Sequence, residues 1–153
     1  MSEGEVSVNF LVSVSNCQGL ESVSDDLLEN YEILAKRVLS CLSAEGLARC
    51  QLPHAIEVNF VDDEVIGRVH GEFFDDPTPT DVITFPYGEH GEVMISVETA
   101  RRQGLEFGRE FEAEIALYVI HGVLHLAGYE DVAEVDRTEM EQVQERLLVR
   151  YWS

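Results

Sequence analysis

Hydrophobic and polar positions divide the first third of the chain into a strand followed by a helix. Every second residue from Val6 to Val14 is apolar, which is typical of a strand with one buried face. From about residue 25 to Ala44 the apolar side chains recur at helical spacing, and Asp25 or Asp26 can cap the helix that this predicts. The apolar positions of that helix are Leu27, Leu28, Tyr31, Leu34, Ala35, Val38, Leu39 and Leu42.

The middle of the chain repeats this order of strand and helix. Residues 54–61 alternate again and predict a second strand. A shorter helix begins at Asp62 or Asp63 and runs to Phe73. The loop that follows, residues 75–80, contains two prolines, which exclude it from a helix.

Two further strands and a helix come next. Strands over residues 82–87 and 92–97 are joined by residues 88–91, a link short enough for a hairpin. Strands joined in this way pair antiparallel. Residues 98–107 predict a helix that ends at Gly108.

The last third of the chain is helical. A strongly apolar segment from Glu114 to Asp131 predicts a buried helix, which opens at Arg109 or Glu110. An acidic amphipathic helix closes the chain, with Val135, Met140, Val143, Leu147 and Leu148 as its apolar positions. The predicted fold is α+β, with one mixed four-stranded sheet and about five helices. The first two strands, joined by a helix, can be parallel, and we expect the apolar helix to lie centrally in a zincin-like arrangement.

Length and composition fit one domain over residues 1–153. Hydrophobic residues make up 45% of the chain and no linker interrupts it, so we expect a single core. No apolar run approaches the ~20 residues that cross a bilayer, so no membrane partner is expected. The first residues are acidic where a signal peptide is basic, which indicates a cytoplasmic protein. Three cysteines without paired spacing indicate reduced thiols: Cys17, Cys41 and Cys50.

The charge balance restricts the possible partners. The net charge is -20, from 30 acidic and 10 basic residues. Broad, non-specific binding of nucleic acid needs a basic surface, so this balance argues against it, and no DNA partner is expected. An RNA could still dock in a local cationic cleft, or a partner could supply the docking energy. The arginines that could line such a cleft are Arg68, Arg101, Arg102 and Arg109.

Two histidines interrupt the apolar segment four residues apart. Because positions i and i+4 lie on one helix face, the imidazoles of His121 and His125 point the same way. Gly128 suits the left-handed end of a helix, and the turn there places Asp131 close to both rings. Two imidazoles and a carboxylate form the three-ligand set typical of catalytic zinc sites, which leave the fourth position to water.

The spacing alone leaves alternatives open. His121 and His125 could be hydrogen-bonded core residues, and Glu130 could replace Asp131 as a ligand. Two histidines and one carboxylate also hold iron in non-haem enzymes. We predict one divalent metal ion at His121, His125 and Asp131, with zinc as the expected ion. The other histidines are isolated and are expected at surface or loop positions: His54, His70 and His90.

The motif His-Gly-x-Leu-His-Leu-x-Gly-Tyr, from His121 to Tyr129, resembles the signature of the YbeY endoribonuclease family. The segment from Pro79 to Pro86 is similar to that family's Pro-Thr-Asp-Val-(Leu/Ile)-(Ser/Thr)-Phe-Pro sequence. The similarity covers the chain from about Glu57 to the C-terminus, and the first fifty residues match only in layout. The resemblance implies a metal-dependent endoribonuclease that acts on single-stranded RNA in rRNA maturation and ribosome quality control. It also implies the ribosome or a ribosomal protein as a partner.

Two positions depart from the family pattern. Most relatives have a third histidine at the position of Asp131, and Tyr-Arg at the position of Phe73-Phe74. The arginine proposed to contact the substrate is therefore missing at Phe74. The two rings could stack on unpaired bases or belong to the core. The resemblance also implies that Thr80 and Asp81 lie beside the metal cleft; alternatively, they only order the turn.

The sequence does not assign a catalytic base. Metalloproteases use the glutamate of His-Glu-x-x-His, but that position is Gly122 here, which argues against a peptidase. Glu114 lies on the histidine face about 10 Å from His121 along the helix axis. That distance suits a hydrogen bond to a metal ligand better than attack on water, and an ion pair is the alternative role.

Two functions of different classes remain. The first is a nuclease in which the metal activates water or neutralises charge on a phosphodiester of single-stranded RNA. The second is a ribosome-associated binding factor with a structural metal and little or no catalysis. The acidic charge and the missing arginine favour the second, and the three-ligand set together with the family resemblance favours the first.

Overall fold

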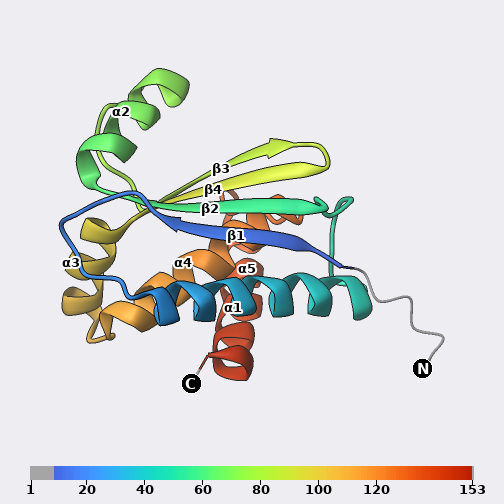
Figure 1. The fold of residues 1–153 in the computed structure, drawn as a ribbon. Helices are drawn as coiled ribbons and strands as arrows, with labels where there is room; N and C mark the ends of the chain where they lie inside the picture. Colours follow the sequence, from blue (N-terminus) through green and yellow to red (C-terminus); the bar gives the residue numbers. More distant parts are fainter. Residues whose placement is uncertain (1–8, 153) are drawn as a thin grey trace.

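The structure is a computed structural model that describes residues 9–152 of the chain (Figure 1). In chain order the elements are β1 (Leu11–Asn16), α1 (Asp25–Ala44), β2 (Ala55–Val61), α2 (Asp63–Phe74), β3 (Val82–Tyr87), β4 (His90–Ser96), α3 (Val97–Phe107), α4 (Phe111–Leu126) and α5 (Glu134–Tyr151). Over these residues the predicted α+β class, four-stranded sheet and five helices are confirmed. The part of the first predicted strand from Val6 to Val8 lies outside the described residues.

The four strands form one mixed sheet in the order β1-β2-β4-β3. β1 and β2 are parallel, with Val12 opposite Ile56, which is the arrangement that the helical connection allowed. β2 and β4 are also parallel, with Val58 opposite Val93. β3 and β4 form the predicted antiparallel hairpin. The hairpin thus adds its second strand to β2 and leaves β3 at the edge of the sheet.

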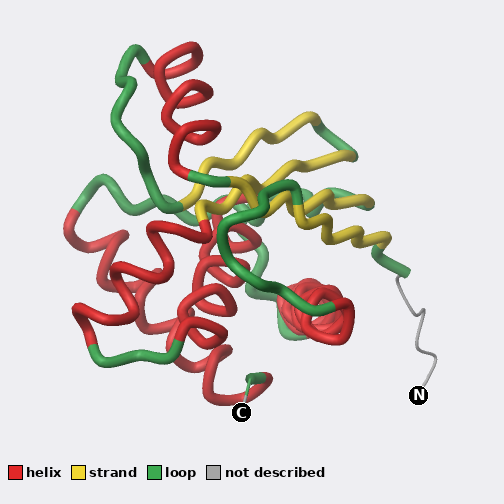
Figure 2. The backbone as a smooth tube through the Cα atoms, turned by 60° about the vertical axis from the view of Figure 1, so that its left-hand side comes forward, coloured by secondary structure: helices red, strands yellow, loops and turns green. Residues whose placement is uncertain are grey.

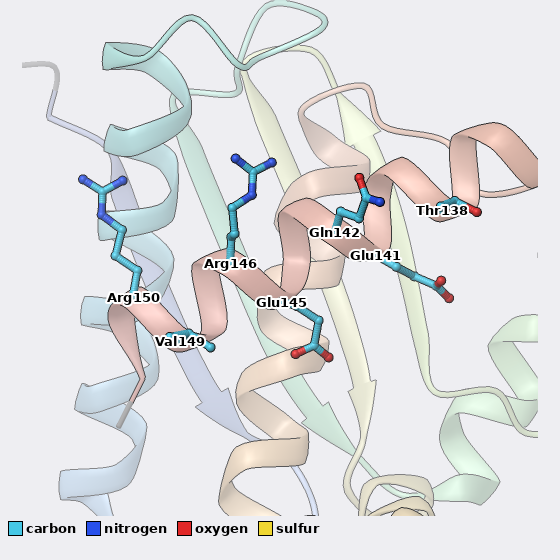
Figure 3. Close-up of a pocket in the computed structure, with 7 residues that line it drawn as sticks. All are labelled: Thr138, Glu141, Gln142, Glu145, Arg146, Val149 and Arg150. Atoms are coloured by element: carbon cyan, nitrogen blue, oxygen red, sulfur yellow. The ribbon is translucent and has the colours of Figure 1, made fainter.

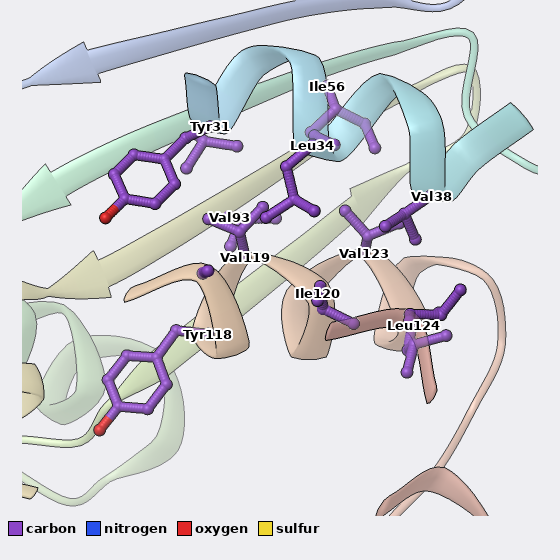
Figure 4. Close-up of a cluster of buried hydrophobic side chains, with 14 of the residues drawn as sticks. Tyr31, Leu34, Val38, Ile56, Val93, Tyr118, Val119, Ile120, Val123 and Leu124 are labelled. Carbon is purple, nitrogen blue, oxygen red and sulfur yellow. The ribbon is translucent and has the colours of Figure 1, made fainter. Parts of the chain in front are cut away.

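Helices cover the two faces of the sheet unequally. α1, α3, α4 and α5 lie on one side, and α2 lies alone on the other (Figures 1 and 2). The main core forms where α1 and α4 meet the sheet (Figure 4). Leu34 and Val38 of α1 and Val119 and Val123 of α4 are all buried there together with Val93 of β4. α4 contacts α1, α3, α5, β3 and β4, so the histidine helix is central as predicted.

Two glycines let α4 approach the sheet closely. A Cβ atom added to Gly122 would lie 2.5 Å from Cγ1 of Val93, and one added to Gly91 would lie 2.8 Å from Cδ1 of Leu126. Both distances are too short for carbon atoms that are not bonded. The absence of these two side chains therefore sets how deeply the histidine helix sits, and position 122 faces the sheet.

The face that α2 covers carries a second, smaller core. Val61, Ile66 and Ile83 are its buried members. Phe73 and Phe74, at the end of α2, are 62% and 53% exposed, so the alternative that they belong to the core is wrong. The buried residues of α2, Ile66 and Gly67, lie in its first two turns, and near its end the ring of Phe73 contacts the ring of Phe85 in β3.

Helix ends follow local capping chemistry. The side chain of Ser24 accepts a hydrogen bond from the backbone of Leu27, so Ser24 caps α1 and the two predicted aspartates occupy its first turn. Asp62 caps α2, as one of the two predicted alternatives. Val135 was predicted on the apolar face of α5 but is 77% exposed, because it lies in the first turn of the helix, before the buried positions begin.

Candidate metal centre

The last two turns of α4 and the bend after them bring three predicted ligands together. His121 and His125 project from one face of α4, and Gly128, with φ at +97°, turns the chain back. The two Nε2 atoms lie 3.0 Å apart. An oxygen of Asp131 lies 3.6 Å from Nε2 of His121 and 3.4 Å from Nε2 of His125. Glu130 is exposed and lies outside this group.

The second nitrogen of each imidazole is held by an oxygen. Nδ1 of His121 lies 2.8 Å from Oε1 of Gln144, and Nδ1 of His125 lies 3.0 Å from the backbone oxygen of Tyr129. Because an oxygen acceptor requires a proton on Nδ1, each ring in its neutral form carries its hydrogen there. Their Nε2 lone pairs therefore face each other and the Asp131 carboxylate.

This arrangement fits a small divalent cation. Three electron-pair donors this close repel one another unless a cation lies between them. Zinc bonds to nitrogen and oxygen at about 2.0–2.1 Å, which places tetrahedral ligand atoms about 3.3 Å apart. The observed separations of 3.0, 3.4 and 3.6 Å bracket that value. The three residues could thus hold a metal ion and leave a fourth position open.

Burial keeps the imidazole of His121 uncharged, the form that can bind a metal. Removal from water lowers the pKa of His121, and the neighbouring His125 lowers it further, while the hydrogen bond to Gln144 opposes both effects. At neutral pH the ring is therefore uncharged. Its contact with Asp131 is then not an ion pair between two charged groups, and the Nε2 lone pair is available to a metal.

Gln144 of α5 is a site residue that the sequence reasoning missed. It is buried among the apolar positions of α5, between Val143 and Leu147. A buried glutamine on an apolar helix face was the available signal, because such a group must find a polar partner. The predicted hydrogen bond from Glu114 to a metal ligand is not what the structure shows, because Gln144 accepts from Nδ1 of His121 in its place.

Glu114 is instead deeply buried beside a cation. Its side chain is 4% exposed, and Oε1 lies 3.6 Å from the guanidinium of Arg109, the alternative role foreseen for it. Oε1 has no hydrogen-bond partner among the described residues. Burial raises the pKa of Glu114, and the charge of Arg109 only partly opposes this.

Two cavities adjoin the histidines, one at each ring. A cavity of about 230 Å³ touches His121 and is also lined by Asp81 and Glu114. A second cavity, of about 260 Å³, touches His125 and is also lined by Thr80. The loop before β3 thus lies beside the histidines, as the family resemblance implied. Asp81 also accepts a hydrogen bond from the backbone of Val82, so it orders the turn as well.

The cavity at His125 contains two residues that were given other roles. His70 and Phe74 both line it. Nδ1 of His70 bonds to the backbone oxygen of Thr78, which fixes the proline-containing loop against α2. Phe74 occupies the position at which the family pattern has an arginine, so this cavity has an aromatic wall there.

Three of the four arginines that could line a cationic cleft lie against carboxylates, and the fourth, Arg68 of α2, is exposed. Arg101 pairs with Glu21 at 2.8 Å, and Arg102 pairs with Asp63 at 2.6 Å. The guanidinium of Arg109 lies 3.6 Å from the carboxylate of Glu114 and 3.6 Å from that of Glu145. With 30 acidic residues against 10 basic ones, carboxylates surround these arginines and neutralise them.

A hollow larger than either of these cavities lies elsewhere. It measures about 780 Å³ and runs along the outer face of α5, where all seven lining residues belong to that one helix (Figure 3). No second element closes it, and none of the three predicted ligands lines it. Across residues 9–152 no helix has the length and apolar character needed to cross a membrane.

Comparison with known proteins assigns this sequence to a protein family. The model of the family described as Endoribonuclease YbeY matches residues 19–152. The chain belongs to the YbeY endoribonuclease family. The match begins well before Glu57, so the prediction that the first fifty residues are similar only in layout is wrong.

Individual YbeY relatives support the assignment. The chain is 35% identical to Endoribonuclease YbeY of Desulforamulus reducens over 91% of this chain and 95% of that protein. It is 31% identical to Endoribonuclease YbeY of Carboxydothermus hydrogenoformans over 90% and 95% of the two chains. The solution structure of TM1509 from Thermotoga maritima superposes with a TM-score of 0.62 at 27% identity, covering 93% of this chain and 89% of that one.

Proposed function

We propose that this protein is a single-domain, metal-dependent endoribonuclease that cleaves single-stranded RNA in rRNA maturation and ribosome quality control in the cytoplasm. The observation that carries the proposal is the convergence of two Nε2 atoms and one carboxylate oxygen within 3.6 Å, in a chain of the YbeY family. His121, His125 and Asp131 are the proposed ligands of one zinc ion. A ribosome or ribosomal protein is the proposed docking partner.

The protein residues around the centre have distinct tasks. A zinc ion held here would lower the pKa of a water molecule and neutralise charge on a phosphodiester. Gln144 and the backbone of Tyr129 orient the two imidazoles by holding their Nδ1 protons. Glu114 is buried next to Arg109, away from the ligand hydrogen bonds, so it is not assigned as the general base.

The two cavities support a single strand as substrate. Each cavity touches one histidine, so each can hold a group on one side of a phosphate at the centre. A single strand can splay its neighbouring bases into such cavities, whereas paired RNA keeps its bases stacked inside a duplex. The aromatic ring of Phe74 offers one of these bases a stacking surface.

The proposal is tested by cleavage of an unstructured RNA by metal-stripped and zinc-restored protein, with elemental analysis of the purified protein. We expect cleavage only after zinc is restored and none for His121→Ala. His54→Ala removes an exposed histidine far along the chain from the motif and is expected to retain full activity. Activity that chelation and His121→Ala both leave unchanged would overturn the proposal.

A second function is favoured by one observation. Arg101 and Arg102 are committed to carboxylates, so little free positive charge is left to attract RNA. We infer a ribosome-associated binding factor with a structural metal as the alternative. It predicts that chelation unfolds the chain and that zinc-loaded protein never cleaves RNA at any concentration.

A further inference from the structure

The cavity beside His121 contains a buried carboxylate oxygen that accepts no hydrogen bond from the described residues, although the guanidinium of Arg109 lies 3.6 Å away. Oε1 of Glu114 is buried without a hydrogen-bond partner, and the side chain lines this cavity. The Tyr118 hydroxyl is close enough to Glu114 to affect its pKa, but the geometry directs its single proton to Oε1 of Gln103, at 2.8 Å. Leaving a buried acceptor without a donor is unfavourable, so this cavity favours a ligand that donates hydrogen bonds.

The charges on the cavity wall exclude a phosphate as that ligand. Asp81 and Glu114 contribute two carboxylates, and Arg109 is the one cation among the lining residues. An anion would meet net negative charge here. The ligand is therefore not an anion, and it carries N–H or O–H donors.

Two glutamines add donors to the same wall. Oε1 of Gln103 accepts from Tyr118, and Oε1 of Gln144 accepts from His121. Because each amide oxygen is engaged, the amino group of each side chain is the part left to face a ligand. The wall thus combines carboxylate acceptors with amide donors, between the apolar surfaces of Phe107 and Leu117.

This combination matches the hydrogen-bonding edge of a nucleobase. A carboxylate has two acceptor oxygens side by side. Guanine presents two adjacent donors, N1–H and the N2 amino group, beside the acceptors O6 and N7. Adenine and cytosine present one amino group next to a ring acceptor, and uracil presents one donor. The volume of about 230 Å³ is below the ~300–1,000 Å³ of pockets for drug-sized ligands, so one ring system fills it.

We propose that this cavity binds the base of the nucleotide next to the scissile phosphate, that Glu114 accepts hydrogen bonds from its N–H groups, and that the preferred base is guanine. The position follows from His121, which lines the cavity and is also a proposed metal ligand. This inference rests on the proposed function for its substrate. It adds a preference for the sequence at the cleavage position.

The decisive experiment measures binding separately from cleavage. Zinc-loaded full-length protein is titrated by calorimetry with the 3′- and 5′-monophosphates of guanosine, adenosine, cytidine and uridine, which contain no internucleotide bond to cleave. We expect one of the guanosine monophosphates to bind about tenfold tighter than the others, within the range of a good bidentate base contact. Glu114→Gln should abolish that preference, because its amino group would face the donors of the base.

Glu145→Gln is the matched control. Glu145 has the same charge and lies 3.6 Å from the same guanidinium of Arg109, but it does not line this cavity. It should keep the guanine preference. Equal affinity for all four nucleotides, or a guanine preference that survives Glu114→Gln, would overturn the inference. Thermal melting shows that each variant is folded.

Mapping the cleavage positions on an unstructured RNA separates this inference from the proposed function. Cleavage beside guanine that becomes indiscriminate in Glu114→Gln supports both. Cleavage at positions unrelated to guanine would support the proposed nuclease function and overturn the proposed guanine-binding cavity. A guanine preference in binding, with no cleavage of any RNA, would support the guanine-binding cavity and overturn the proposed nuclease function.

Discussion

Oε1 of Gln144 lies 2.8 Å from Nδ1 of His121, and this hydrogen bond joins the final helix to the helix that carries both histidines. The contact fixes which nitrogen of His121 carries the proton and turns Nε2 towards His125 and Asp131. The second imidazole is fixed by a backbone oxygen, which substitution cannot remove. Gln144 is therefore the point at which the orientation of the centre can be tested.

Replacing Gln144 should weaken metal binding without unfolding the chain. Gln144→Ala removes the acceptor from His121, and loss of such an outer partner typically costs about 10–100-fold in metal affinity. Gln144→Glu keeps an acceptor oxygen and should recover most of that loss. Zinc affinity is measured by competition with a chromophoric chelator. Gln142→Ala, at an exposed position of the same helix, is the control and should bind zinc like the wild type. Equal affinity of Gln144→Ala and wild type would show that the hydrogen bond does not orient the ligand.

Substitutions at Asp131 should separate its charge from its position. Asp131→Asn keeps the size of the side chain and removes the negative charge, and should reduce zinc affinity more than the ~10–100-fold expected for an outer partner. Asp131→His introduces the third histidine of the family pattern and should bind zinc more tightly than Asp131→Asn. The neighbouring Glu130→Gln should have no effect, since Glu130 lies outside the cluster. The same chelator competition measures all three, and a larger effect at Glu130 than at Asp131 would reverse the assignment.

Gly122→Ala should destabilise the fold through a clash with the sheet. The new Cβ would lie 2.5 Å from Cγ1 of Val93. Overpacking costs about 1–3 kcal/mol, and the better helix propensity of alanine returns up to about 1 kcal/mol. We expect a net loss of about 1–2 kcal/mol in the free energy of unfolding, or a melting temperature lower by roughly 2–8 °C.

A double-mutant cycle tests the origin of that loss. Val93→Ala removes the atoms that the new methyl group would meet, so it should compensate part of the cost of Gly122→Ala. Gly19→Ala is the control, because a Cβ there meets nothing within 4 Å. Strictly additive effects of the changes at positions 122 and 93 would rule out the clash as the cause.

Glu114→Gln should stabilise the protein at neutral pH and not in acid. The pKa of Glu114 is raised from its model-peptide value of 4.5 because burial disfavours the charged form. The contribution of this carboxyl to stability is fully present below pH 4.5 and is lost as the pH rises through its folded pKa. Glutamine does not ionise, so the difference in unfolding free energy between variant and wild type should grow from pH 4 to pH 7. Urea unfolding across this range measures it, and Glu112→Gln, exposed on the same helix, should show no such growth. A constant difference would mean that ionisation is not the cause.

The local sequence was enough to predict the helices and strands and the placement of both histidines on one face of α4. The spacing of four between His121 and His125 places both rings on one face of α4 whatever surrounds it. Gly128, with its positive φ, ends that helix and returns the chain towards the rings. Both features depend on backbone geometry over a few residues, so periodicity and a glycine were enough to predict that Asp131 would approach the histidines.

Tertiary structure alone decided what surrounds the histidines. Gln144 reaches His121 across 23 positions of sequence, and the cavity that they share is lined from β3, α3, α4 and α5 or their flanking loops. The exposure of Phe73 and the neutralisation of Arg102 also depend on elements far away in the chain. Hydrophobic periodicity records whether a side chain is apolar and which face of its element it occupies. It holds no information on which distant polar group will satisfy a buried one, because that partner is chosen only when the helices pack.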